Sequence, residues 1–348
     1  MIKISPVTLG QLDFFRPANR GTAHLRGWIF REDTPIDRVD ISLNDQAWAS
    51  QISLYERPDV ERAFASVVDS CAHVSHSGFD VTAPLPLGVE TNPKTIVEIT
   101  PYTPAGVRLD PLRMHFFPYA GETNESNPPA ELQDRVGGRK DFAAIGGNIT
   151  NLILTYVGKY KRIAEAKRIL DWGCGCGRVI AHMKKFVSPD RLYGCDIDMA
   201  AIEWDKQNIV GPIFDRIEPY PPTNYPERYF DIVYGISVMT HLEEETQLRW
   251  LKELERICRT GAIIALSVMG EKLRATNMPA ALMKPFAEKG FASFVPNYSD
   301  MLTVFSHRDY YQEAYHTLNY IESEWGRYFD VLEYVETKYQ DIVILQAN

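Results

Sequence analysis

The chain of 348 residues is long enough for two domains of ordinary size. Apolar residues make up 45% and charged residues 24% of it, a balance typical of globular proteins with a full core. The formal net charge of −9 disfavours nonspecific binding to nucleic acid or to an anionic membrane surface. The sequence has no apolar run of about 18 residues, so no transmembrane helix is predicted. The first residues, MIKISPVTLGQLDFF, do not have the pattern of a signal peptide.

The 5 cysteines are an odd and small number for this length and do not suggest a disulfide framework. We therefore expect reduced thiols and a cytoplasmic location.

The first part of the chain, residues 1–120, is predicted to be an antiparallel, immunoglobulin-like β-sandwich. Short segments rich in β-branched and aromatic residues alternate with turn signals such as Ser77-Gly78. The segments are TAHLRGWIF, RVDISLN, AWASQISL, SGFDVTAPL, TIVEITPYT and VRLDPLRMHFF. A polar stretch, GETNESNPPAE, opens a linker and covering segment over residues 121–141.

Residues 142–348 are predicted to form a second domain in which strands and helices alternate. Helical patterns at 142–166, 179–186, 199–208 and 243–258 separate apolar strands at 168–171, 192–196, 212–214, 230–235 and 261–268. This order indicates a parallel sheet with helices on both faces. The last strands, 329–335 and 341–346, are too close in sequence for a crossover helix and must be antiparallel.

The glycine-rich stretch RILDWGCGCGRV joins the first strand of this domain to a helix. A zinc site is disfavoured because Cys174 and Cys176 are one residue apart and no second cysteine pair follows, so we expect no metal. A dinucleotide fingerprint requires a glycine where Arg178 stands, and no Gly-Lys-Ser/Thr sequence of a P-loop follows.

The remaining pattern, Asp-x-Gly-x-Gly-x-Gly, suits a ligand with a cationic amino group. The glycines let the backbone approach a ligand closely, and Asp171 puts a carboxylate at the strand end, which attracts an ammonium group. Asp196 ends the next strand, where an acid can accept hydrogen bonds from ribose hydroxyls. An amino acid joined to a nucleoside describes S-adenosylmethionine.

Four stretches in this order resemble the class I S-adenosylmethionine-dependent methyltransferases. They are DWGCGCGRV, GCDID, YFDIVYGISVMTHL and, after a helix, the strand IIALSV. The resemblance covers residues 128–348 and implies a Rossmann-like seven-stranded sheet of order 3-2-1-4-5-7-6. It implies cofactor contacts from both acids, from the loop and from residues after the second and fourth strands. The full expected cofactor set is Arg135, Asp171, Gly173, Cys174, Gly175, Gly177, Asp196, Ile197, Asp215, Ser237 and Val238.

Some of these residues have specific expected roles. Asp215 is the candidate to read the adenine amine, and Cys174 is expected to act through its backbone only. Arg135 and Phe142 belong to a stretch, RVGGRKDFAAIG, that is similar to segments folding over the cofactor in bacterial members. Asp198 is expected to cap a helix instead.

His241, after the fourth strand, and His316, in YYQEAYHTL, are the candidate catalytic bases. A hydroxyl acceptor needs a base to take its proton, and histidine titrates in the right range. Each histidine could equally be structural: His241 as a helix-start residue and His316 as a packed side chain.

The acceptor is expected to be a small molecule or a glycan, without nucleic acid or membrane insertion. No Asn/Asp-Pro-Pro-Tyr/Phe signature of adenine and amide methyltransferases follows the fourth strand. Residues 269–315 are expected to form the substrate wall, with aromatic side chains from Phe291, Phe294, Tyr298 and Phe305. GWIF, RPDVERAF and SGFDV resemble β-sandwich modules of bacterial enzymes of surface-polysaccharide assembly, which suggests a sugar hydroxyl.

Several alternatives remain open at this point. The chain could be a noncatalytic binding or scaffold protein with this fold, or an N- or C-methyltransferase of a small metabolite. The β-sandwich could itself be the working part, binding carbohydrate or a partner protein. The sequence also leaves homo-oligomerisation open.

Overall fold

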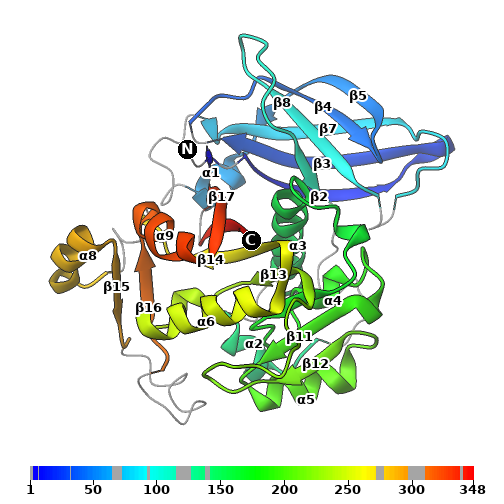
Figure 1. The fold of residues 1–348 in the computed structure, drawn as a ribbon. Coiled ribbons are helices and arrows are strands. Elements are labelled where there is room, and N and C mark those ends of the chain that lie inside the picture. The colour runs from blue at the N-terminus through cyan, green and yellow to red at the C-terminus, as the bar shows by residue number, and fades with distance from the viewer. Residues whose placement is uncertain are drawn as a thin grey trace. The chain divides into compact units, whose positions relative to one another are not determined.

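The chain folds into two compact units, whose elements are drawn in Figure 1. The computed structural model describes residues 3–6, 8–31, 33–64, 73–91, 95–114, 127–137, 142–271, 278–296, 310–337 and 340–348. Unit 1 comprises residues 1–5, 124–142 and 156–348, and unit 2 comprises residues 6–123 and 143–155. These boundaries differ from the predicted ones, because residues 1–5 belong to unit 1 and helix α3 (Phe142–Gly158) is divided between the units.

Unit 2 is built on two four-stranded antiparallel sheets, as the strand spacing predicts. One has the order β2-β3-β7-β6 and the other the order β5-β4-β8-β9. Leu25 and Phe79 from the first sheet share one buried cluster with Val39 and Ile99 from the second, so the sheets form a sandwich. The strands are β2 (Thr8–Pro17), β3 (Thr22–Arg31), β4 (Arg38–Leu43), β5 (Gln46–Ser53), β6 (Tyr55–Glu56), β7 (His76–Pro84), β8 (Val97–Tyr102) and β9 (Leu112–Met114).

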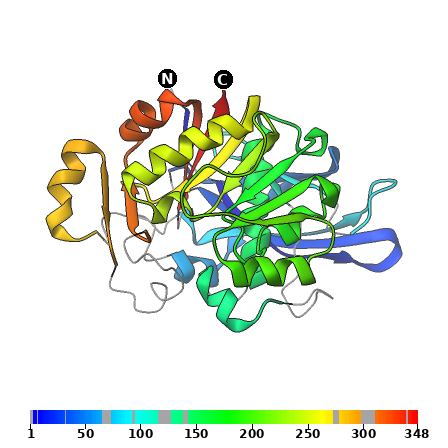
Figure 2. The same ribbon diagram turned by 60° about the horizontal axis from the view of Figure 1, so that its bottom comes forward.

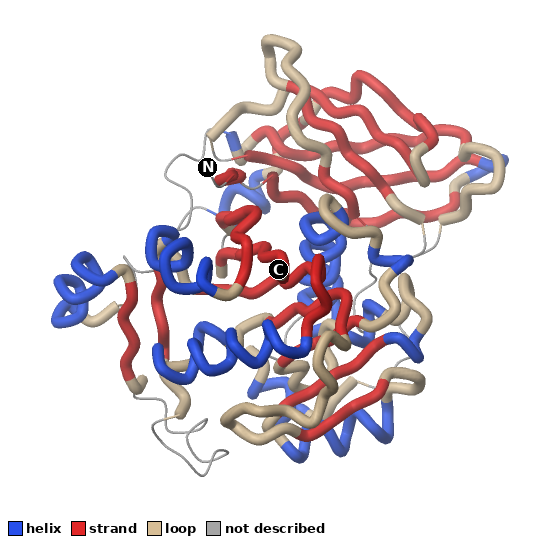
Figure 3. The backbone as a smooth tube through the Cα atoms, viewed as in Figure 1, coloured by secondary structure: helices blue, strands red, loops and turns tan. Residues whose placement is uncertain are grey.

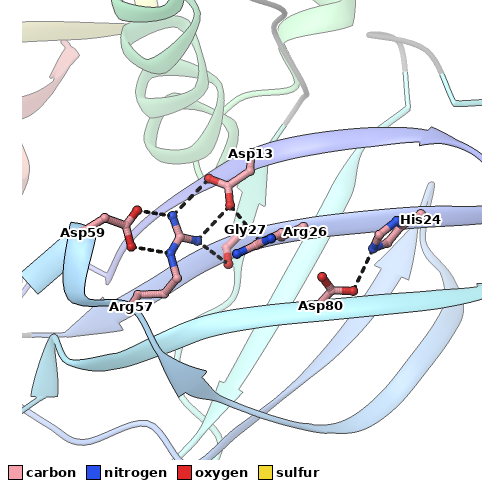
Figure 4. Close-up of polar contacts among 7 residues, drawn as sticks. All are labelled: Asp13, His24, Arg26, Gly27, Arg57, Asp59 and Asp80. Atoms are coloured by element: carbon pink, nitrogen blue, oxygen red, sulfur yellow. Dashed lines mark hydrogen bonds and ion pairs between the residues drawn. The ribbon is translucent and has the colours of Figure 1, made fainter.

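Unit 2 has elements that the sequence did not predict, among them β2, β6 and α1. Strand β2 pairs along the length of β3, and α1 (Pro58–Phe64) is a single short helix. Just before α1, Arg57 makes paired hydrogen bonds to Asp59 and Asp13 and a further one to the carbonyl oxygen of Gly27 (Figure 4). Only 7% of Arg57 is exposed, so this guanidinium ties β2, β3 and the start of α1 together.

Unit 1 contains an eight-stranded sheet of order β12-β11-β10-β13-β14-β18-β17-β1. Its first seven positions are the predicted order 3-2-1-4-5-7-6, and that prediction is confirmed. β10 to β14 pair in parallel, whereas β18 is antiparallel to both β14 and β17. The strands are β10 (Ile169–Trp172), β11 (Leu192–Asp196), β12 (Ile213–Arg216), β13 (Phe230–Gly235), β14 (Cys258–Val268), β17 (Phe329–Glu336), β18 (Asp341–Ala347) and the unpredicted edge strand β1 (Lys3–Pro6).

The helices of unit 1 alternate with these strands, as Figure 3 makes visible. Right-handed crossovers put α4 (Ile180–Met183) and α5 (Met199–Asn208) on one face of the sheet and α6 (Glu244–Ile257) on the other. Figures 1 and 2 show α6 running alongside the sheet. Trp250 of α6 is buried against Trp172 of β10, with ring centroids 5.1 Å apart. The order of the strands reverses between β10 and β13, and ligands of open α/β sheets bind at such a reversal.

The insert after β14 contributes a separate two-stranded sheet. β15 (Phe291–Phe294) pairs with β16 (Glu313–His316), next to α8 (Met283–Lys289). Phe291 and Phe294 lie in β15, whereas Tyr298 and Phe305 lie outside the described residues. No helix in the described part of the chain is both long and apolar enough to cross a membrane.

The Arg57 ion pairs generate a stability prediction. Replacing Arg57 by Met removes all five of its hydrogen bonds and leaves Asp13 only the longer contact to Arg26 at 3.6 Å, so we expect unit 2 to lose about 2 kcal/mol of unfolding free energy. Hydrogen exchange of the β2 and β3 amides in the full chain measures this loss. Arg113→Met is the matched control, because Arg113 pairs with Glu98 from an exposed position. It should cost less than about 1 kcal/mol, and an equal loss in both variants would contradict the prediction.

Candidate functional site

The loop after β10 holds its three glycines in the left-handed region, where φ is 75° at Gly173, 54° at Gly175 and 71° at Gly177. A Cβ atom on Gly173 would lie 2.3 Å from Val238 Cγ2, and one on Gly175 would lie 2.4 Å from Val136 Cγ1. Both positions therefore require glycine for backbone conformation and for space.

Hydrogen bonds fix this loop to the end of β11. The amides of Gly173 and Cys174 donate to the carbonyl of Cys195 at 2.8 and 3.1 Å. The Asp196 carboxylate accepts the Gly175 amide through Oδ2 and the Asp198 amide through Oδ1, both at 2.8 Å. Burial raises the pKa of Asp196, while these backbone donors oppose the shift. Asp196 therefore shapes the loop from within.

Asp171 lies at the inner end of the loop, with only 3% of its surface exposed. No described residue donates a hydrogen bond to its Oδ2. Burial raises the pKa of Asp171 to about 8, and the nearby Asp196 adds to the shift, while Tyr234 and Arg178 act against it. A buried carboxyl group that lines a cavity and has an oxygen without a described donor is suited to a cationic ligand.

A cavity of about 390 Å³ opens over the loop, at the strand-order reversal. Unit 1 alone supplies its walls, from α2 (Ala130–Arg135), the ends of β10, β11 and β13, the turn η6 (Met239–His241), helix α6 and the turn before β18. Nine of the eleven predicted cofactor residues line it: Arg135, Asp171, Gly173, Cys174, Gly175, Asp196, Ile197, Ser237 and Val238.

Two predicted cofactor residues, Gly177 and Asp215, do not line the cavity. A Cβ on Gly177 would lie 2.2 Å from Ile209 Cδ1, so this glycine serves packing. Asp215 is in register with Cys195 instead of Asp196, and its carboxylate accepts a hydrogen bond from Tyr225 at 3.0 Å. Ile217, beyond β12, lines the cavity in its place.

The covering segment is held through an ion pair. Arg135 Nη1 donates to Asp198 Oδ2 at 2.6 Å, and the other oxygen of Asp198 caps α5 by accepting the amides of Ala200 and Ala201. The expected capping role of Asp198 is confirmed. Phe142 packs with Leu132 in a small buried cluster and does not line the cavity.

His241 lines the cavity from η6. Its Nδ1 lies 3.1 Å from the carbonyl oxygen of Gln312, which makes Nδ1 the protonated nitrogen and leaves Nε2 as an acceptor. The ring stacks on Tyr311, with centroids 4.1 Å apart. Burial lowers the pKa of His241 to about 4, below the range in which the sequence analysis expected a base to titrate, so the imidazole is neutral at neutral pH.

His316 is fully buried and does not line the cavity, so the structure corrects its expected role as a base. Its Nε2 donates to Gln247 Oε1 at 2.8 Å, because the Gln247 amide nitrogen is committed to the carbonyls of Met239 and Leu242. Burial lowers the pKa of His316 to about 3. It is a core histidine that, through Gln247, supports the turn carrying His241.

Gln340 is a cavity residue that no sequence motif predicted, and it binds the predicted residue Ser237. Ser237, whose φ is 60°, donates to Gln340 Oε1 at 3.0 Å, and the buried Ser267 donates to the same oxygen at 2.7 Å. Gln340 precedes β18, more than a hundred residues away in sequence, and carried no motif. Arg178 was noted only as a departure from the dinucleotide fingerprint. The other lining residues missed include Ile217, Trp250, Tyr310 and Tyr311.

Comparison with known proteins adds a family and several similar structures. Residues 170–266 match the family model described as "Methyltransferase domain". Solved structures with a similar fold include S-adenosylmethionine-dependent methyltransferases from Methanosarcina mazei (17% identity, 55% of this chain and 96% of that one, TM-score 0.40) and Mesorhizobium loti (11%, 55% and 94%, 0.40). A protein from Pyrococcus horikoshii is similar at 15% identity over 63% of this chain and 96% of its own, with a TM-score of 0.43.

The family match agrees with the features already described, and the solved structures are too distant to add to it. The matched residues run from β10 through the glycine loop to β14. They include the buried carboxyl group of Asp171, the glycines that admit a ligand, and the acid that ends β11. Residues 170–266 of this chain therefore form a methyltransferase domain.

Proposed function

We propose that this methyltransferase acts on a hydroxyl group of a small molecule or of a sugar in a surface glycan. The observation that carries the proposal is the neutral imidazole of His241 on the cavity wall, with its Nδ1 proton engaged by the Gln312 carbonyl. That arrangement leaves Nε2 free of a proton at neutral pH. A base in this state is required for a hydroxyl acceptor and is not required for most amines.

The cavity residues fit the cofactor by two tests of their own geometry. The unpartnered Oδ2 of Asp171 suits the ammonium of the methionine part. Gly173 and Gly175 line the cavity without side chains of their own, so a ligand can approach the backbone there. Asp196, with Ile197 beside it, would hold the ribose and adenine end, and Ser237 and Val238 would form the floor. Bound S-adenosylmethionine supplies an electrophilic methyl group on a sulfonium.

His241 Nε2 would accept the hydroxyl proton while the acceptor oxygen is alkylated. The Gln312 carbonyl would stabilise the imidazolium by keeping its hydrogen bond to Nδ1–H. Tyr311 covers one face of the ring and limits its rotation. These contacts orient the base and exclude water, which is the protein's part in a displacement at a sulfonium.

The aromatic lining supports a sugar-like or other ring-bearing acceptor. Tyr310, Tyr311 and Trp250 line the cavity, and aromatic faces pack well against the C–H faces of rings. The Tyr310 hydroxyl and the Trp250 N–H both donate to the carbonyl of Pro219, so their rings are fixed in place. The similarity of the N-terminal segments to modules of polysaccharide enzymes points in the same direction.

Removing the charge of Asp171 should weaken cofactor binding. A charge-assisted hydrogen bond is worth about 1.5–3 kcal/mol, so Asp171→Asn should reduce affinity for S-adenosylhomocysteine by about 10- to 100-fold. Isothermal titration calorimetry measures the change. Asp190→Asn, at a surface position away from the cavity, is the control and should bind as the parent does. Unchanged affinity in Asp171→Asn would disprove the role of this carboxylate.

Cofactor affinity should also depend on pH. Asp171 has a raised pKa of about 8 in the free protein, so it is protonated below that pH, whereas an ammonium ligand requires the carboxylate. Binding then releases about one proton, and affinity should rise about tenfold per pH unit until it levels off near pH 8. Calorimetry at pH 6.5 in phosphate and in Tris measures the released protons. Equal heats in both buffers would contradict this linkage.

The proposed base is tested by His241→Asn, which keeps a donor for the Gln312 carbonyl but removes Nε2. We expect kcat to fall by about 10²- to 10⁴-fold, with affinity for S-adenosylhomocysteine unchanged. Radiolabelled methyl transfer to methyl glycosides, nucleotide sugars and lipid-linked glycans provides the rate. His76→Asn, an exposed change in unit 2, is the control. If the parent enzyme labels none of these hydroxyl compounds, the proposed acceptor class is wrong. If His241→Asn keeps full activity, His241 is not the base.

A further inference from the structure

Arg178 is a partly buried cation on the cavity wall that the proposed chemistry does not use. It follows the last glycine of the loop. Its Nε is buried, and no described residue accepts a hydrogen bond from it. Burial lowers the pKa of Arg178, while Cys176 and Asp171 act against the shift. A guanidinium held in this way is costly unless a ligand supplies an acceptor.

The loop itself offers few donors to an anion. The amides of Gly173 and Cys174 are bonded to the Cys195 carbonyl, that of Gly175 to Asp196, and that of Gly177 to the Cys174 carbonyl. Backbone amides are the usual anion-binding groups of a glycine loop before a helix. Because these four already have acceptors within the protein, we look to a side chain as the donor for a ligand carboxylate.

We propose that Arg178 binds the carboxylate of the cofactor's amino-acid end while Asp171 binds its ammonium, so that the enzyme selects donors with an intact α-amino-acid group. The two side chains interact electrostatically and both line the cavity. Arg178 and Asp171 carry opposite charges, and each has a polar atom without a described partner. They therefore match the carboxylate and the ammonium of the cofactor's amino-acid end. The proposal rests on the cofactor site described above but not on the acceptor hydroxyl.

Arg135 is the rival anchor, and its contacts argue against it. Its Nη1 is committed to Asp198 Oδ2 at 2.6 Å, and Asp198 also caps α5. Moving Arg135 to a ligand would break that ion pair. Arg178 has no such competing contact among the described residues. A guanidinium also suits a carboxylate, because its donors match the two oxygens.

The test compares three ligands on the full chain by calorimetry: S-adenosylhomocysteine, its decarboxylated analogue S-adenosyl-3-thiopropylamine, and 5′-methylthioadenosine. Arg178→Met should weaken S-adenosylhomocysteine binding by about 10- to 100-fold. It should change the affinities for the two ligands without a carboxylate by less than about threefold. The ratio of affinities within one variant is the readout, so a small loss of folded protein does not affect it.

Two further variants complete the design. Arg178→Lys keeps the charge without the paired donors and should fall between the parent and Arg178→Met. Arg249→Gln, at an exposed position on α6, is the matched control and should bind all three ligands as the parent does. Equal losses for S-adenosylhomocysteine and its decarboxylated analogue in Arg178→Met would overturn the proposal. Failure of the parent to bind S-adenosylhomocysteine would instead overturn the cofactor site itself.

Discussion

The site depends on one constraint: a carboxyl group without a hydrogen-bond donor on Oδ2 is buried at the end of β10, beside a loop in which every second residue is glycine. Burial makes the ionised form of Asp171 costly unless a cation approaches. Gly173 and Gly175 line the cavity and have no Cβ, so a ligand can approach the backbone there. Both features are needed for a cationic ligand to bind. A glycine loop without the acid would show no preference for a cation, and side chains in place of the glycines would keep a ligand away from the acid.

The walls around this point are joined by short chains of polar contacts. Asp196 binds the loop amide of Gly175 and the amide of Asp198, while the Asp198 side chain caps α5 and pairs with Arg135 of α2. On the other wall, His316 binds Gln247, which holds the carbonyls of the turn that carries His241. The second series of contacts begins in the core at His316 and ends at the cavity, so core packing sets the position of His241.

A comparable arrangement stabilises unit 2 around Arg57. The guanidinium uses its donors on two carboxylates and a carbonyl from β2, β3 and α1, and it lowers the pKa of Asp59 to about 2. The outcome differs from that at Arg178, where Nε has no described acceptor. Two arginines of one chain thus illustrate the difference between a guanidinium whose partners are all internal and one suited to a partner from outside.

The sequence by itself determined the sheet order, the loop and the positions of the two acids that we propose hold the cofactor. Strand–helix alternation, the spacing of the glycines and the positions of Asp171 and Asp196 are all local patterns, and local backbone geometry follows from them. It also predicted the sandwich of unit 2, although β2 and the edge strand β1 were missed. Tertiary structure decided which histidine meets the cavity, because His241 and His316 differ in burial and not in any local pattern. It likewise decided the roles of Asp215 and Gln340, since strand register and contacts over long sequence separations depend on how the whole sheet packs.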